Sequence, residues 1–154
     1  MVNRFWWVLF IVLIAAILGV VSAKFRPLAV PDVVRLAVPD PDCDLRAGPC
    51  TGRFAGGGAL SLSVEPRGIP LARALELKVT TRDLAAGAVA LDLAGVDMDM
   101  GYNRPSLAPA GSGLYRGEGM LPVCVRRRMT WEARVLLSTP DGLFAAPFRF
   151  ETSR

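Results

Sequence analysis

Residues 60–64 read LSLSV and residues 75–80 read LELKVT, and in both stretches every second residue is apolar. The same alternation recurs at residues 89–93, 131–137 and 144–150. A period of two is typical of antiparallel strands that bury one face and expose the other. The segments between them, PRGIP, AAG, APAGSG and TPDG, have turn chemistry. About seven short strands at this spacing predict an all-β, immunoglobulin-like antiparallel β-sandwich.

The N-terminus carries one unbroken apolar run, residues 6–23, without any charge. As a helix it would extend about 27 Å, close to the roughly 30 Å hydrocarbon core of a bilayer. Val21-Ser22-Ala23 could also be a signal-peptide cleavage site, but the run is longer than a usual signal core. We therefore expect one transmembrane helix at residues 1–23, with the soluble domain in the periplasm or outside the cell. The protein would then be a single-pass protein of the inner (cytoplasmic) membrane.

The next segment, residues 24–57, is rich in proline, which favours extended chain. We expect a stalk there, followed by the β-sandwich domain at residues 58–154. The stalk ends in the tight loop PDCDLRAGPC, where Cys43 and Cys50 are seven residues apart. In an exported protein this spacing favours a disulfide, with a metal or redox pair as the alternative. Cys124 is then expected to be free.

Composition excludes several function classes. The chain of 154 residues has no histidine, so Ser-His-Asp triads and histidine-based zinc or copper(II) sites are ruled out. An enzyme is not expected. The net charge is only +4, and the single basic cluster is Arg126-Arg127-Arg128. These arginines could be a solvated surface or could contact a phosphate, a lipid headgroup or an acidic partner. The sequence shows no basic face interleaved with aromatic residues, so we do not expect it to bind nucleic acid.

The period of two breaks down after the strand at residues 89–93. Continuing it would bury Asp97 and Asp99, which is costly for unpaired carboxylates. Either the chain leaves the sandwich near Gly95 with Met98 and Met100 exposed, or Gly95 forms a bulge that turns both methionines inward.

These methionines could fill gaps in the core. Alternatively, they could be thioether ligands of a soft metal such as copper(I), which needs no histidine. Met120, Cys124 and Met129 would add sulfur atoms if the connections that carry them meet at one end of the sandwich. The candidate metal ligands are Met98, Met100, Cys124 and Met129.

The stretch VDMDMGYNRPSLAPAGSGLYRGEGMLPVCVRRRMTWEARV resembles the YtkA-like and FixH-like family of small membrane-anchored domains. The shared motifs are "MDMG", a spacer with Leu107, "GLYRGEG" and "MTWEARV", and the similarity covers residues 58–151. It implies an immunoglobulin-like sandwich, a site at Met98 and Met100, and a role in copper handling and haem–copper oxidase assembly. Relatives often carry a histidine after "MG", where this chain has Tyr102, which leaves only sulfur ligands.

Two functions follow from these observations. The first is an extracytoplasmic binding module that holds copper(I) and assists a respiratory oxidase or its assembly factors. The second is an accessory or structural subunit of a membrane complex that binds no metal.

Overall fold

The computed structural model describes residues 2–24, 32–123 and 126–153, and these form two compact units divided after Pro31. The first unit contains helix α1 (Val2–Lys24). We expected a transmembrane helix within residues 1–23; among the described residues, no helix has both the length and the apolarity needed to cross a bilayer.

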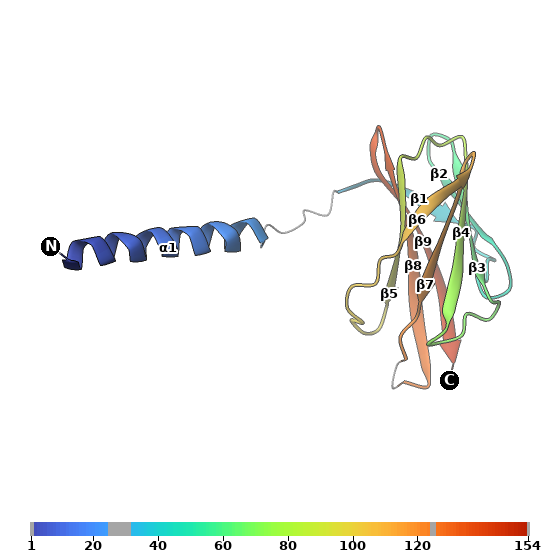
Figure 1. Ribbon diagram of the computed structural model, residues 1–154. Helices are drawn as coiled ribbons and strands as arrows, with labels where there is room; N and C mark the ends of the chain where they lie inside the picture. The colour runs from blue at the N-terminus through green and yellow to red at the C-terminus, as the bar shows by residue number, and fades with distance from the viewer. Residues whose placement is uncertain (1, 25–31, 124–125, 154) are drawn as a thin grey trace. The chain divides into compact units, whose positions relative to one another are not determined.

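The second unit is a barrel of nine strands (Figure 1). The strands are β1 (Val33–Pro39), β2 (Cys50–Phe54), β3 (Ala59–Glu65), β4 (Ala74–Arg82), β5 (Ala88–Gly95), β6 (Ser106–Gly111), β7 (Leu114–Met120), β8 (Arg128–Thr139) and β9 (Gly142–Ser153). Their order around the barrel is β1-β2-β3-β4-β7-β6-β5-β8-β9, with β9 next to β1. The β1–β9 pair is parallel and the other pairs are antiparallel.

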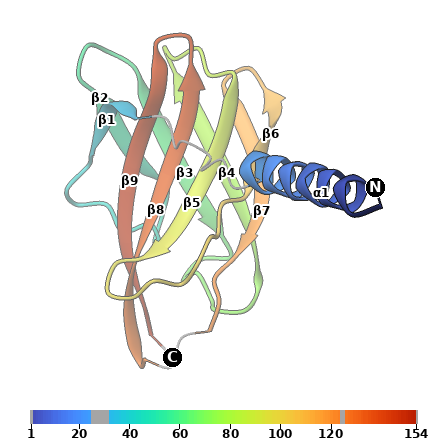
Figure 2. The same ribbon diagram turned by 90° about the vertical axis from the view of Figure 1, so that its left-hand side faces the viewer.

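The predicted seven-stranded immunoglobulin-like sandwich is therefore wrong, and two strands account for the difference. A sandwich leaves the edges of both sheets unpaired, whereas a barrel has no edges. Here β1 pairs with β2 on one side and β9 on the other, while β6 pairs with both β5 and β7. Each strand thus connects the two halves and closes the structure (Figure 2).

Strands β1 and β2 lie inside residues 24–57, which were expected to form a stalk. In β1 only Ala37 is buried, and the exposed residues include Val34, Leu36 and Val38. The strand thus lacks the alternation of a half-buried strand, and its backbone pairing holds it in place. Pro39 limits its length, because the strand ends at this proline.

The core follows the predicted period of two in the strands that the sequence identified. Leu60, Leu62 and Val64 of β3 point inward, as do Leu75, Leu77 and Val79 of β4. Trp131 of β8 is fully buried, and its Nε1–H donates to Thr152 Oγ1 at 2.9 Å. This bond satisfies the only polar group of the largest core side chain.

The connections β5–β6 and β7–β8 lie toward the same end of the barrel, which we call the methionine end (Figures 1 and 2). The register establishes this placement: Gly95 at the end of β5 lies opposite Trp131, near the start of β8. The amide of Asn103 also donates to the carbonyl of Met120 at 2.9 Å, joining the two connections directly.

Candidate functional site

Gly95 determines how the chain leaves β5. The strand ends there, and the next residue is still held, because Val96 N–H donates to Thr130 O of β8 at 3.0 Å. A Cβ on Gly95 would overlap the carbonyl oxygen of Met98 and the Cε methyl of Met129. Only glycine therefore allows the chain to fold back this closely over the end of β8.

The same position brings two methionines together. The point where a Cβ of Gly95 would lie is 3.2 Å from Cγ of Met100 and closer still to Cε of Met129. Met129 on β8 is 2% exposed, while Met98 and Met100 are half-buried and pack against the core. We call Met98, Met100 and Met129 the methionine cluster. The two predicted alternatives, an exit of the chain at Gly95 or a bulge that turns Met98 and Met100 inward, are each partly met. The chain leaves β5 at Gly95, yet Met98 and Met100 remain packed against the core of the barrel.

Hydrogen bonds hold the β5–β6 connection over the cluster. The carboxylate of Asp99 accepts from Gly101 N–H at 2.8 Å, and Gly101 has a φ of +77°, which favours glycine. Further along, Leu93 N–H donates to Asn103 O at 2.9 Å. The segment that carries Met98 and Met100 is thus fixed at both ends.

Met120, another predicted sulfur position, does not join this cluster. Met120 lies at the same end, but it is half exposed, and only its backbone carbonyl is bound to the β5–β6 connection. Cys124 lies outside the described residues. Met98, Met100 and Met129 thus stay predicted ligands, and Met129 is the buried one of the three.

The donor chemistry of the cluster fits a soft cation. Thioether sulfur prefers copper(I) and similar ions over zinc or magnesium. Among the described residues, no group of three or more histidine, cysteine or acidic side chains could hold a metal ion.

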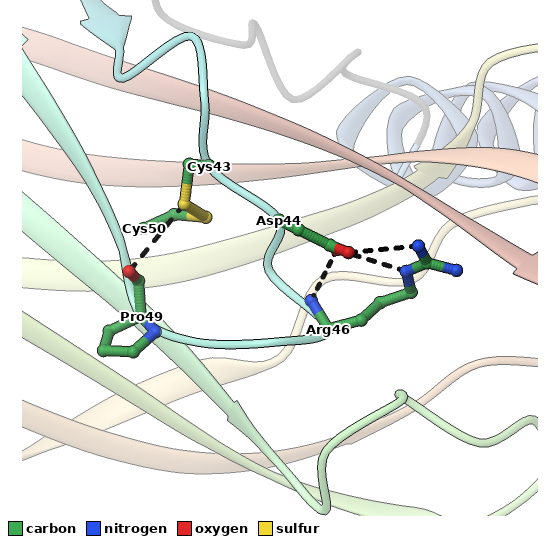
Figure 3. The surroundings of a disulfide bond; sticks show 5 residues. All are labelled: Cys43, Asp44, Arg46, Pro49 and Cys50. Carbon is green, nitrogen blue, oxygen red and sulfur yellow. Dashed lines mark hydrogen bonds and ion pairs between the residues drawn. A yellow bond between two sulfur atoms is a disulfide. The ribbon is translucent and has the colours of Figure 1, made fainter.

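The disulfide between Cys43 and Cys50 is present, with 5.6 Å between the two Cα atoms (Figure 3). It closes the β1–β2 connection, and Cys50 is a core residue of β2. Inside the ring, the Asp44 carboxylate accepts from the side chain and the backbone N–H of Arg46. These hydrogen bonds lower the pKa of Asp44. The ring therefore belongs to the barrel.

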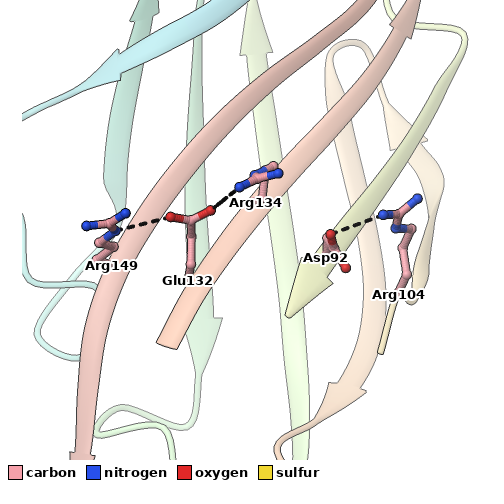
Figure 4. Close-up of polar contacts among 5 residues, drawn as sticks. All are labelled: Asp92, Arg104, Glu132, Arg134 and Arg149. Atoms are coloured by element: carbon pink, nitrogen blue, oxygen red, sulfur yellow. Dashed lines mark hydrogen bonds and ion pairs between the residues drawn. The ribbon is translucent and has the colours of Figure 1, made fainter. Parts of the chain in front are cut away.

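A second polar arrangement, which sequence reasoning missed, lies on the outer face of β5, β8 and β9 (Figure 4). Glu132 is held between Arg134 and Arg149, and its side chain is only 12% exposed. Burial raises the pKa of Glu132, but hydrogen bonds from the two arginines outweigh burial and lower it. Asp92 forms a similar pair with Arg104 at 3.1 Å.

These carboxylates are all paired with arginine, so we assign them a structural role. The alternation in β8 places Glu132 and Arg134 on the outer face. The contact between Glu132 and Arg149, however, depends on the register of β8 against β9.

No family model, curated protein or solved structure matched this chain. The resemblance to the YtkA-like and FixH-like family therefore stays a prediction.

Proposed function

We propose that the barrel is a non-catalytic binding module that holds copper(I) through the methionine cluster. The observation that carries the proposal is the convergence of Met100 and Met129 at Gly95. Met129 is buried, whereas Met98 and Met100 are only half-buried, so the side chains of Met98 and Met100 are partly accessible from solvent. Neutral thioether ligands in an apolar setting bind copper(I) in preference to harder ions.

We also propose that the domain works outside the cytoplasm. The Cys43–Cys50 disulfide supports this location, because disulfides persist in oxidising compartments. A role beside a haem–copper respiratory oxidase or its assembly factors is proposed on the motif resemblance alone.

A second candidate function is an accessory module that binds no metal. Its support is the burial of Met129 and the packing of Met98 and Met100 against the apolar core. In this case the three methionines close the end of the barrel as flexible apolar side chains.

Copper(I) competition against a chromogenic chelator separates the two functions. The full chain is used anaerobically with ascorbate, which keeps copper reduced without adding a thiol. We expect Met98→Leu/Met100→Leu to weaken binding by at least about tenfold, because loss of groups that only support a metal ligand already costs about 10–100-fold. Folding should be kept, since such swaps usually cost under about 1.5 kcal/mol.

The matched control is Met120→Leu, which removes an exposed thioether at the same end and should leave affinity unchanged. Unchanged affinity in the double variant would exclude the methionine cluster as the site. Absence of copper(I) binding by the unaltered chain would support the accessory module.

A further inference from the structure

The methionine end carries an unusual exposed surface. Among the described residues of the barrel, large exposed apolar side chains occur on β1 and in the connections β5–β6 and β7–β8. Those of the connections are Val96, Tyr102, Met120 and Val123, and Tyr102 is 83% exposed. Clustered exposed apolar residues often indicate an interaction site. We call residues 96–105, 120–123 and 126–128 the end surface.

The end surface is held in shape before any partner binds. The amide of Asn103 donates to the Met120 carbonyl at 2.9 Å, and Arg104 pairs with Asp92 at 3.1 Å. The guanidinium of Arg104 also lies over the ring of Tyr102, with its Cζ 5.4 Å from the ring centroid. A fixed surface loses little conformational entropy on association.

The charges of the end surface are divided between its two connections. The β7–β8 side carries exposed Arg126, Arg127 and Arg128, and the β5–β6 side carries exposed Asp97 and Asp99. Arg128 forms an ion pair with Glu151, with 3.7 Å between Nε of Arg128 and Oε2 of Glu151. In the described part of the chain, no ion pair within 4.0 Å is formed by Arg126, Arg127 or Asp97. Opposite charges are thus available on the two sides.

We propose that the end surface binds a second copy of this chain in a two-fold symmetric dimer. Arg126 and Arg127 of one copy would face Asp97 and Asp99 of the other, with the exposed apolar residues between them. A two-fold interface uses the same patch twice, so it needs both signs of charge on one surface.

The closed barrel makes this the favoured way to self-associate. A sheet with free edges can pair through its backbone, but a closed barrel has no such edge. Association must then use side chains. Stable interfaces bury about 800 Å² on each partner, so a surface limited to two connections predicts a weak, reversible dimer. The proposal does not depend on copper binding, and its test contains no metal.

Sedimentation velocity of the full chain, at about 50 mM and about 500 mM salt, measures this dimer. We expect Arg126→Glu/Arg127→Glu and Asp97→Lys/Asp99→Lys each to raise the dimer dissociation constant by at least about tenfold. An equimolar mixture of the two variants should form a heterodimer. A chain with all four substitutions should dimerise again.

Helix α1 is unchanged in every variant, so association through its exposed apolar side chains would not follow this pattern. The control is Arg53→Glu/Arg82→Glu, which makes the same charge change at the opposite end of the barrel, where both residues lie opposite Ala59. It should leave the dissociation constant unchanged. A monomeric unaltered chain, an unaffected reversal variant, or failure of the fourfold variant to dimerise would each overturn the proposal.

Discussion

Gly95→Ala should destabilise the barrel, and the structure indicates by how much. The new methyl group would overlap the Met98 carbonyl oxygen and the Met129 methyl group, and would lie 3.2 Å from Cγ of Met100. The Met129 side chain can change rotamer, but the Met98 carbonyl belongs to the backbone of a connection fixed by hydrogen bonds. Overpacking of this kind costs about 1–3 kcal/mol.

Alanine also restricts the unfolded chain, which offsets about 0.4–1 kcal/mol of that cost. The net loss in the free energy of unfolding should therefore be about 1–2 kcal/mol. The matched control is Gly87→Ala, just before the other end of β5, where the nearest atom to a new Cβ is Ser138 O at an ordinary 3.6 Å. This variant should be as stable as the unaltered chain or slightly more stable.

The assay is urea unfolding of the full chain, followed by the fluorescence of Trp131 in a background where Trp6 and Trp7 are phenylalanine. Trp131 lies opposite Gly95 in the sheet and is fully buried, so its emission reports unfolding of the barrel. Equal unfolding midpoints for Gly95→Ala and Gly87→Ala would refute the close packing on which the methionine cluster depends.

Two further predictions concern the barrel. Thr152→Val should cost about 1–3 kcal/mol, because the buried Trp131 Nε1–H loses its acceptor, whereas Thr152→Ser should retain most of the stability in urea unfolding. The pKa of Glu132 is lower in the folded state, so its stabilising contribution is present above the unfolded pKa of about 4.3 and is lost as the pH falls through the folded value. Unfolding midpoints measured from pH 6 down to about pH 3 should show a smaller loss for Glu132→Gln than for the unaltered chain, and equal pH dependence would contradict the assignment.

Much of the strand content could be predicted because it is encoded in local alternation. The stretches LSLSV and LELKVT lie in strands with one buried face, and so does WEARV, after which Leu136 is also buried on the opposite face. Strand β6 was harder to recognise, since Leu107 is its only buried residue and its APAG segment has turn chemistry. Strand β1 likewise buries only Ala37. Such strands are held by backbone hydrogen bonds, which every residue type except proline can donate, so the side chains carry little signal.

The candidate site was also only partly accessible from sequence. Met98 and Met100 were recognised because the alternation of buried residues in β5, if continued, would have placed Asp97 and Asp99 in the core. The grouping with Met129 depended on the register of β5 against β8, which places Gly95 beside the start of β8. The Glu132 cluster required the β8–β9 register as well.

The sequence by itself determined the β class, the inward and outward faces of the regular strands, and the residues of the Cys43–Cys50 ring. These properties follow from side-chain polarity and from short separations along the chain. Closure of the barrel was decided only by the tertiary structure, because β1 pairs with β9 at the far end of the chain and β6 bridges β5 and β7, which belong to different halves. The burial of Met129 under the β5–β6 connection was decided in the same way, since it depends on a close approach that Gly95 permits but does not by itself specify.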